Sequence, residues 1–544
     1  MISSLIGSAL TAPITVNIAL VSLILYGIRT IYRCAFSPLD NIPGPPNKSW
    51  ITGNLTQYFD PDGWQWHKDL KEKYGQVVKV HGWFGDRQLY IFDAMALNTM
   101  LVKDPHIFNE TPKLIGLNYL IFGKGIFAST DDAHRKYRKI MLPAFSTASL
   151  RGMVPLFYEV AERVRDGLIF PSVRDGPQRL DFNSILSRAS LELIGRTGIG
   201  YSFDPLIAGQ EPTDRFAQAL QEIIPTSFEF SLLHPLLPAI LKYTSPAVQR
   251  FLIKIMPSPT LHRLRDLIDF KDAAARQLVR DREASIRSGD HKDDARDILS
   301  ILMKGNLSGE EGRALTEEEL VAATGTIILA ATDTTSSSMN KMFHLMSENP
   351  EMQEKLREEI LAAPEHLDLA ELEALPYLDS FVRETLRLFP GVNPGVFRQT
   401  TQDTVLALSE PLIGVDGTPT KEISIPKGTS VYVGIAAANH NPRIWGPDVL
   451  EFTPERWTGG KAANVTTKLC GIYGNTMTFL GGERSCIGVK FSQIEMKVIT
   501  AVLLRSFKFS SPDPRVKWRM TGIIPSPNID NKPNLPILVE RLKL

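Results

Sequence analysis

The sequence predicts a mainly α-helical protein with minor β-sheets and an N-terminal transmembrane helix. Residues 94–389 have a mostly helical pattern, and short strand-like runs with glycine turns lie on either side of them. The first 28 residues contain no charged side chain. The chain has 544 residues, 43% of them hydrophobic and 22% charged, so it has enough apolar material for a large core.

Residues 1–28 are expected to form a single-pass membrane anchor, because the apolar run exceeds the roughly 20 residues that a bilayer requires. A cleaved signal peptide fits less well, since no basic residue precedes the run and its length is greater than usual. A buried core helix would have little reason to lie at the extreme terminus. Arg29 and Arg33 follow the run, and the positive-inside rule then keeps the remaining chain cytosolic.

Residues 29–46 are interpreted as a basic and proline-rich linker, because the prolines of residues 42–46 stiffen the chain and prevent the anchor helix from continuing. The remaining residues, 47–544, are expected to form one domain without internal repeats. Its expected elements, in chain order, are strands at 77–80 and 88–92, helices over 94–389 with loops near 109–129 and 203–213, and strands within 405–433.

One long helix is predicted over residues 316–349, about 51 Å at 1.5 Å per residue, with Thr316 and Glu319 as a capping box. Its stretch 320–331 is nearly uncharged, as expected of a helix that crosses a protein interior. Asp333 and Thr334 then place a carboxylate and a hydroxyl in this apolar environment, which is costly unless the carboxylate is used or paired. The alternative is that such hydroxyls only bond their own helix backbone.

Composition excludes several classes of function. Lysine plus arginine and aspartate plus glutamate both number 60, so net charge gives no indication of a nucleic-acid partner. Three cysteines are too few for a disulfide framework and favour a reducing compartment. The sequence has no zinc motif, no Gly-x-Gly-x-x-Gly fingerprint and no Walker loop, and therefore no recognisable nicotinamide or flavin domain.

The most informative segment is Phe-Leu-Gly-Gly-Glu-Arg-Ser-Cys-Ile-Gly, which ends at Gly488 and directly precedes an apolar helical run. Cys486 therefore lies at a helix N-terminus, where partial positive charge and free amides favour a thiolate. Gly482 and Gly488 allow close approach of a large flat ligand, Phe479 can pack beside the sulfur, and Arg484 can pair with an anionic edge. A thiolate held in this way suits axial ligation of haem iron.

These ten residues resemble the haem-binding signature of the cytochrome P450 family, Phe-x-x-Gly-x-Arg-x-Cys-x-Gly, at every fixed position. An inert buried cysteine is the commonest alternative for a lone cysteine, and six matched positions argue against it. The resemblance implies the cytochrome P450 fold and a haem b cofactor. It makes Cys486 the axial iron ligand, Arg484 a haem-propionate partner and Phe479 the residue that tunes the sulfur.

Three further groups of residues match the same family. Asp333 and Thr334 resemble its oxygen-binding motif, in which the threonine holds the dioxygen hydrogen-bond network and the acid feeds protons to it, although Ala331 replaces the usual glycine. A Glu-x-x-Arg motif and a Pro-Glu-Arg-Trp segment imply a buried structural triad of Glu384, Arg387 and Arg456. The remaining expected haem-propionate partners are His134, Arg138 and Arg398, with His134 standing where the family usually has tryptophan.

The basic run around Arg138, with Lys490 and Lys497, is either a solvated face or a docking surface for an acidic electron-transfer partner. The resemblance implies that NADPH electrons arrive through a separate NADPH–cytochrome P450 reductase, with cytochrome b5 as a second candidate donor. It also implies an endoplasmic reticulum location with the catalytic domain in the cytosol.

The predicted function is that of a fungal-type microsomal haem-thiolate monooxygenase, which inserts one atom of dioxygen into a lipophilic small molecule of specialised metabolism, such as a terpenoid, sterol or fatty-acyl compound. Residues 114–127, 228–241 and 395–397 are apolar and are candidates for the pocket lining, although ordinary core packing is the better explanation for any single one of their residues. A haem-thiolate desaturase, isomerase or dehydratase is the main alternative, and a haem sensor is a third.

Overall fold

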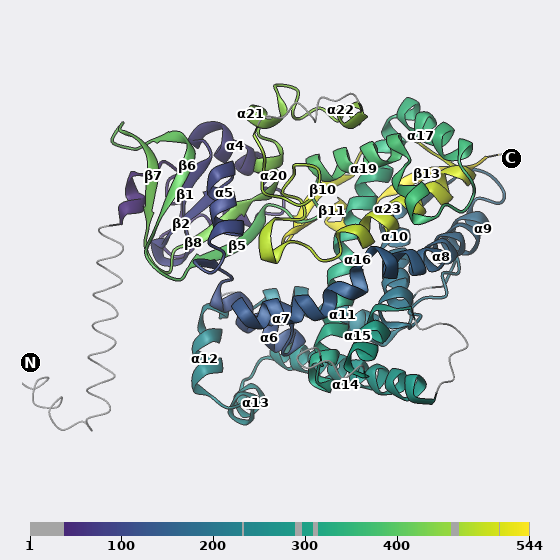
Figure 1. The fold of residues 1–544 in the computed structure, drawn as a ribbon, viewed down its shortest axis with the longest axis horizontal. Helices are drawn as coiled ribbons and strands as arrows, with labels where there is room; N and C mark the ends of the chain where they lie inside the picture. The colour runs from purple at the N-terminus through teal and green to yellow at the C-terminus, as the bar shows by residue number, and fades with distance from the viewer. Residues whose placement is uncertain are drawn as a thin grey trace, which may run out of the picture.

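The structure is a computed structural model that describes residues 37–210, 212–230, 233–288, 296–307, 314–458, 467–510 and 512–542. It is mainly helical with small sheets, as predicted (Figure 1). The α-helices are α3 Leu55–Tyr58, α4 Trp64–Tyr74, α5 Ala94–Asn98, α6 Pro112–Phe122, α7 Asp131–Met141, α8 Thr147–Arg163, α9 Phe170–Ser172, α10 Phe182–Ile194, α11 Arg215–Phe228, α12 Leu237–Tyr243, α13 Pro246–Ile255, α14 Pro259–Ser288, α15 Ile298–Leu307, α16 Glu317–Glu348, α17 Pro350–Ala362, α18 Leu369–Glu373, α19 Pro376–Leu388, α20 Ile435–Asn439, α21 Pro442–Trp445, α22 Glu455–Thr458 and α23 Val489–Ser506.

The strands form four small sheets. The largest has the order β1-β2-β8-β5-β3, and the others have the orders β10-β11-β12, β4-β13-β9 and β6-β7. Their bounds are β1 Val77–His81, β2 Arg87–Ile91, β3 Phe108–Asn109, β4 Gln178–Asp181, β5 Gly395–Thr400, β6 Thr404–Ile413, β7 Pro419–Ile425, β8 Ser430–Gly434, β9 Phe507–Ser510, β10 Lys517–Thr521, β11 Ile524–Ile529, β12 Lys532–Pro533 and β13 Pro536–Arg541. The strands expected near 77–92 and within 405–433 are therefore present.

The central strand of the largest sheet, β8, is buried along its whole length, as its Val-Tyr-Val sequence favours. It pairs in parallel with β2 and antiparallel with β5. This sheet packs around its own apolar cluster on one side of the molecule, and the helices occupy the other side (Figure 1).

The long helix α16 crosses the middle of the protein (Figure 1) and begins with the predicted capping box. The Thr316 hydroxyl accepts a hydrogen bond from the Glu319 amide at 3.2 Å, and the Glu319 carboxylate accepts one from the Thr316 amide at 2.9 Å. The helix packs against α10, α14 and α23 and is buried along most of its length. The absence of charged side chains from residues 320–331 is therefore explained by their place in the interior.

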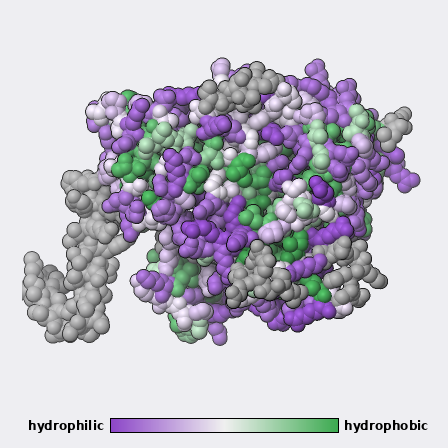
Figure 2. Space-filling view, viewed as in Figure 1, coloured by the Kyte–Doolittle hydropathy of each residue, from purple (hydrophilic) through white to green (hydrophobic). Residues whose placement is uncertain are grey.

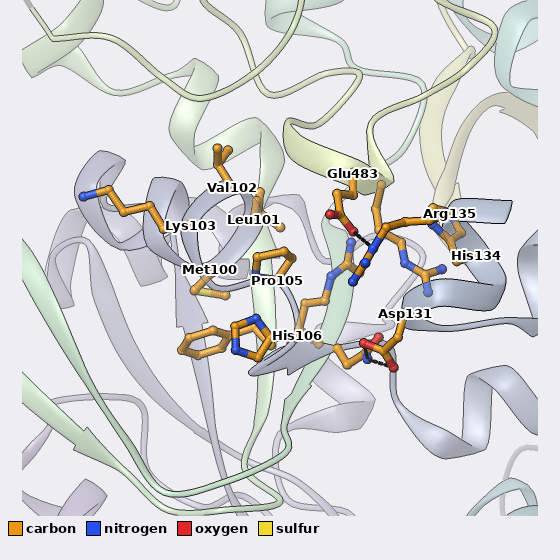
Figure 3. Close-up of a pocket in the computed structure, with 14 residues that line it drawn as sticks. Met100, Leu101, Val102, Lys103, Pro105, His106, Asp131, His134, Arg135 and Glu483 are labelled. Atoms are coloured by element: carbon orange, nitrogen blue, oxygen red, sulfur yellow. Dashed lines mark hydrogen bonds and ion pairs between the residues drawn. The ribbon is translucent and has the colours of Figure 1, made fainter. Parts of the chain in front are cut away.

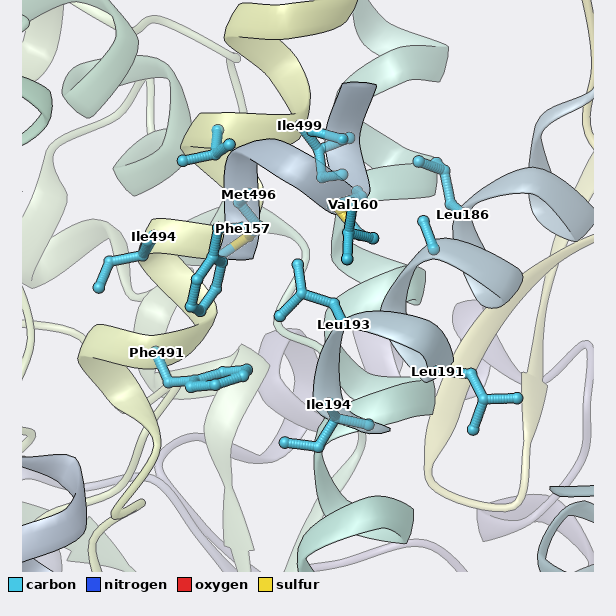
Figure 4. Packing of buried hydrophobic residues seen from close by; sticks show 14 of the residues in the cluster. Phe157, Val160, Leu186, Leu191, Leu193, Ile194, Phe491, Ile494, Met496 and Ile499 are labelled. Carbon is cyan, nitrogen blue, oxygen red and sulfur yellow. The ribbon is translucent and has the colours of Figure 1, made fainter. Parts of the chain in front are cut away.

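The main core is formed where α8, α10 and α23 meet (Figure 4). Phe157 of α8 stacks on Phe491 of α23, with ring centroids 5.0 Å apart. Leu193 and Ile194 of α10 complete the contact, and all four side chains are at most 3% exposed. This packing fixes the N-terminal end of α23, which directly follows Cys486.

A buried carboxyl group lies in the same core and leads to a test of stability. Glu495 of α23 is fully buried, and it accepts a hydrogen bond from the Ser190 hydroxyl at 2.6 Å. Burial raises the pKa of Glu495 from 4.5 to about 8. The folded state therefore keeps a proton that the unfolded state releases above pH 4.5, and this group lowers stability as the pH rises from about 4.5 to about 8.

We expect Glu495→Gln to remove this loss and to flatten the dependence of melting temperature on pH between pH 5 and pH 8. Thermal unfolding of the wild type and the variant across this range checks the prediction. An unchanged slope in the variant would contradict it.

Three expectations need comment. The loop expected near 109–129 contains α6, which begins with Pro112 at its first position and ends before Gly123 at a positive φ of 85°. The strands after residue 507 were not predicted. Residues 1–36, which include the expected anchor, lie outside the described residues. Within the described ranges, no single helix is long and apolar enough to cross a membrane. Two consecutive helical segments, 131–145 and 147–172, together have the length and composition of a span but are bent by 54° where they meet.

Candidate active site

The segment before α23 holds Cys486 through backbone contacts. The Cys486 amide donates a hydrogen bond to the Phe479 carbonyl at 2.9 Å, and the Gly488 amide hydrogen-bonds the sulfur. Gly482 has φ 70°, and a Cβ there would lie 1.8 Å from the Leu101 carbonyl oxygen. Only glycine fits this position, so this residue brings the loop against the segment that follows α5.

The Cys486 thiol lies deep in the protein, yet its surface is exposed. These two facts agree only if the sulfur borders an internal space rather than the outer surface. The sequence suggested that the helix N-terminus would lower the thiol pKa. Burial instead raises the pKa of Cys486, because it outweighs the Gly488 amide and the charge of Arg138.

The middle of α16 has the same combination of depth and exposure. Ala330 and Asp333 are exposed although the helix crosses the interior, and Thr334 is half-buried. The Asp333 carboxyl nevertheless lies deep in the protein, and this burial raises its pKa. The Thr334 hydroxyl donates to the Ala330 carbonyl at 2.9 Å, as the simpler sequence interpretation anticipated, and its oxygen remains able to accept.

Four basic side chains gather near the cysteine loop. His134 is 4% exposed, and its pKa is lowered to about 3 by burial and by three arginines, Arg484, Arg138 and Arg398, with a smaller effect from Arg135. The structure thus brings together all four residues that the sequence proposed as propionate partners. They come from α7, β5 and the cysteine loop, which are far apart in the chain.

Each arginine is fixed by oxygen acceptors. Arg138 donates to the Ser485 carbonyl at 2.6 Å, and Arg484 donates to the Ser129 carbonyl at 2.5 Å. Arg398 forms an ion pair with Glu110 at 2.9 Å, and Arg484 lies 3.9 Å from the same carboxylate. Sequence reasoning did not identify Glu110, because nothing in its local pattern indicates a partner almost 290 residues away.

A small pocket of about 170 Å³ opens beside this cluster (Figure 3). Arg135 of α7 and Glu483 of the cysteine loop point toward each other across it and form an ion pair at 3.2 Å. His134, Arg398 and Arg484 also line it. The cluster is therefore next to a polar opening, where anionic groups can be held.

The residues present fit a haem. Cys486 offers a sulfur that borders an internal space, and Ala330 shows that the middle of α16 also borders such a space. Arg398 and Arg484 share the carboxylate of Glu110, and Arg138 donates only to the uncharged oxygens of Ser485, so the cluster has positive charge left for two propionates. The family resemblance and the observed side chains therefore point to the same group.

The proposed triad is assembled around a fully buried carboxylate. Glu384 accepts two hydrogen bonds from Arg387, at 2.7 and 2.8 Å, and lies 3.4 Å from Arg456. The Trp457 indole also donates to Glu384 at 3.0 Å. The sequence predicted only aromatic packing for Trp457, so this hydrogen bond is an addition from the structure.

The prediction that Lys497 contributes to a basic docking surface was wrong. Lys497 is buried and forms an ion pair with Asp379 at 2.8 Å, so it is not available to an electron-transfer partner. Lys490 is exposed and lies 3.5 Å from Glu373, and Lys136 and Lys139 of α7 are also exposed.

Comparison with known proteins shows the family of this chain. A family model described as "Cytochrome P450" matches residues 43–529. The chain is 41% identical to cytochrome P450 monooxygenase 91 of Postia placenta, over 96% of this chain and 97% of the relative. It is 34% identical to ganoderic acid synthetase CYP5150L8 of Ganoderma lucidum, over 93% and 94% of the two chains. The chain belongs to the cytochrome P450 family and is a cytochrome P450 monooxygenase.

Proposed function

We propose that this monooxygenase transfers one oxygen atom of dioxygen to a lipophilic small molecule, with electrons supplied from NADPH by a separate reductase. The observation that carries the proposal is that Cys486 and the Asp333–Thr334 segment of α16 both border space inside the protein. A surface cysteine or a solvated acid would not have this combination of depth and accessibility.

Cys486 is proposed as the axial thiolate, with Phe479, Gly482 and Gly488 shaping the loop that carries it. His134, Arg138, Arg398 and Arg484 are proposed to hold the propionates. When bound, a haem with a thiolate ligand supplies the chemistry that activates dioxygen and favours cleavage of its O–O bond.

Asp333 and Thr334 are proposed to move protons on the substrate side of the site. Burial moves the pKa of Asp333 upward, toward neutral pH, and a carboxyl with a pKa nearer the working pH can both take up and release a proton. The Thr334 hydroxyl donates its hydrogen bond to the Ala330 carbonyl, and its oxygen can accept another hydrogen bond at the same time. The two residues are adjacent in the accessible stretch of α16, and we propose that a proton passes from the Asp333 carboxyl to Thr334 through the space that both border.

We expect Thr334→Ala to lower product formation by roughly 10²-fold, the lower end of general acid–base contributions, while NADPH oxidation continues. The ratio of product formed to NADPH consumed measures the effect. Thr332→Ala is the matched control, because Thr332 also donates to the carbonyl four residues earlier, at 2.8 Å, but lies on the buried side of the helix. Equal ratios in both variants would refute the role of Thr334.

A lipophilic substrate is supported by the apolar surface near α6. Gly116 of α6 packs against Leu237 and Leu241 of α12, within the apolar ranges proposed for the pocket lining. Apolar side chains on α12 and α13 are exposed, among them Ile240, Phe251 and Ile255. Green areas lie at the lower left of Figure 2, where Figure 1 places these two helices. We propose that this surface faces a membrane from which substrate enters.

The compound class is proposed as terpenoid, sterol or fatty-acyl, in specialised metabolism. One relative is named a ganoderic acid synthetase, and another, from Hericium erinaceus, is 32% identical over 92% of this chain. We further propose anchoring in the endoplasmic reticulum membrane by residues 1–28, a linker at 29–46 and a cytosolic catalytic domain at 47–544.

Omission of the electron source tests this function against its main alternative. A monooxygenase needs NADPH and the reductase for every turnover, whereas an isomerase or dehydratase needs neither. We expect product formation from membranes containing the protein to cease when either component is left out. Continued turnover without NADPH would replace the proposal with isomerisation or dehydration.

A further inference from the structure

A second cavity, of about 350 Å³, is lined by residues of α4, the C-terminal half of α16, the end of α19, α20 and the β10–β11 hairpin. Its volume is within the range of small-molecule sites, roughly 300–1,000 Å³. Most of its wall is apolar, with rings from Trp64, Tyr90, Phe389 and Trp518. None of the residues proposed for the active site lines it.

The charges around this cavity all have one sign. Lys68, Lys71 and Lys341 line it, while no aspartate, glutamate or arginine does so among the described residues. Lys71 lies 3.5 Å from His440, a buried imidazole whose pKa is lowered to about 3 and which is therefore neutral. Lys68 lies 3.9 Å from Glu72 in an exposed pair at the rim.

Lys341 is the innermost of the three cations. Its ammonium lies 4.2 Å from the centre of the Phe389 ring and 4.7 Å from that of Trp518, and within the described ranges it has no ion pair or hydrogen bond. Two aromatic faces stabilise a cation but do not neutralise it. Burial lowers the pKa of Lys341 to about 8, partly offset by the charge of Glu348, so the ammonium form still predominates at pH 7.

The walls that hold Lys341 are fixed. The Trp518 indole donates to His344 at 2.9 Å, and the Trp64 indole donates to the Trp518 carbonyl at 2.7 Å. These bonds tie β10 to α16 and α4 on either side of the ammonium. The cation is therefore presented to the cavity by a preformed frame, which reduces the ordering cost of binding.

We infer that this cavity binds the carboxylate of a lipophilic acid, with the carboxylate on Lys341 and the apolar body against the aromatic wall. Lys341 is the one lysine of the lining that has neither a hydrogen bond nor an ion pair among the described residues, and a single negative charge matches it. The lining has no arginine fork of the kind that suits phosphate. Lys341 follows Thr334 by seven residues, about 10 Å along the helix, and neither Asp333 nor Thr334 lines this cavity.

Decanoate and decanol are suitable probes, because they share a chain and differ in charge. Binding is measured calorimetrically with the full-length, haem-loaded protein in phosphatidylcholine nanodiscs, and the active site is filled with 4-phenylimidazole. We expect decanoate to bind under these conditions, and decanol to bind at least about tenfold more weakly, because the charge-assisted hydrogen bond is absent. Lack of decanoate binding, equal affinities, or displacement of decanoate by 4-phenylimidazole would overturn the inference.

Substitutions of Lys341 and Lys68 test which of these lysines binds the carboxylate. Lys341→Met should weaken decanoate binding at least about tenfold and leave decanol binding unchanged, which also reports that the cavity has kept its shape. Lys341→Arg should restore binding, and Lys68→Gln at the rim should change it less than about threefold. A larger effect of Lys68→Gln than of Lys341→Met would refute the site. Weaker decanoate binding in discs that contain phosphatidylserine would also refute it, because lipid headgroups would then be the anions that this surface binds. These readouts do not depend on turnover.

Discussion

Replacement of Cys486 by serine is expected to reduce NADPH-dependent product formation below roughly 1% of the wild type, because the hydroxyl does not supply the electron density of a thiolate. The reduced carbon monoxide difference spectrum should lose its thiolate signature in the same variant. Both losses follow from the position of this sulfur at the wall of an internal space.

Cys470→Ser provides the control for this experiment. Cys470 is the other cysteine that the structure describes, and burial raises the pKa of its thiol to about 11. Its sulfur lies 3.9 Å from that of Met477, so it packs as an apolar side chain. The variant should keep the thiolate spectrum; loss of that spectrum in Cys470→Ser and its retention in Cys486→Ser would contradict the assignment.

Glu384→Gln is expected to lower the free energy of unfolding by about 3–5 kcal/mol, because it leaves the buried charges of Arg387 and Arg456 without their shared carboxylate. Arg387 and Glu384 are both fully buried, so water cannot replace the lost partner. Equilibrium denaturation of the haem-loaded protein measures the change.

The matched control is Glu283→Gln on α14. Glu283 pairs with Arg287 at 2.6 Å, but both side chains are about half exposed or more, and loss of such a pair costs less than about 1 kcal/mol. Similar effects of the two substitutions would show that the Glu384 cluster is not a buried support of the fold.

The features predicted best from the sequence are those that depend on local patterns. The capping box at Thr316 and the uncharged run after it determine α16 within one or two residues of its bounds. Helix α6 was missed because glycine, asparagine and proline occur within it or at its ends, and tertiary contacts with α12 and α16 decide its conformation. Strand β13 pairs with β4, more than 350 residues earlier, and no local pattern indicates that pairing.

The same distinction applies to the site. Cys486 and Thr334 belong to motifs with fixed spacing, so the sequence could propose them and their neighbours. Glu110 acquires its role only when β3 and β5 pair and bring it beside Arg398. The cavity around Lys341 was also not predicted, because its walls come from elements spread along the chain from α4 to β11.

Incorporation of isotopically labelled dioxygen tests the central claim most directly. Membranes containing the protein and a reductase are supplied with NADPH, labelled dioxygen and a set of terpenoid, sterol and fatty-acyl compounds, and products are analysed by mass spectrometry. We predict a product that carries one labelled oxygen atom and is absent with Cys486→Ser. A product that forms at the wild-type rate without label would contradict oxygen insertion by this site.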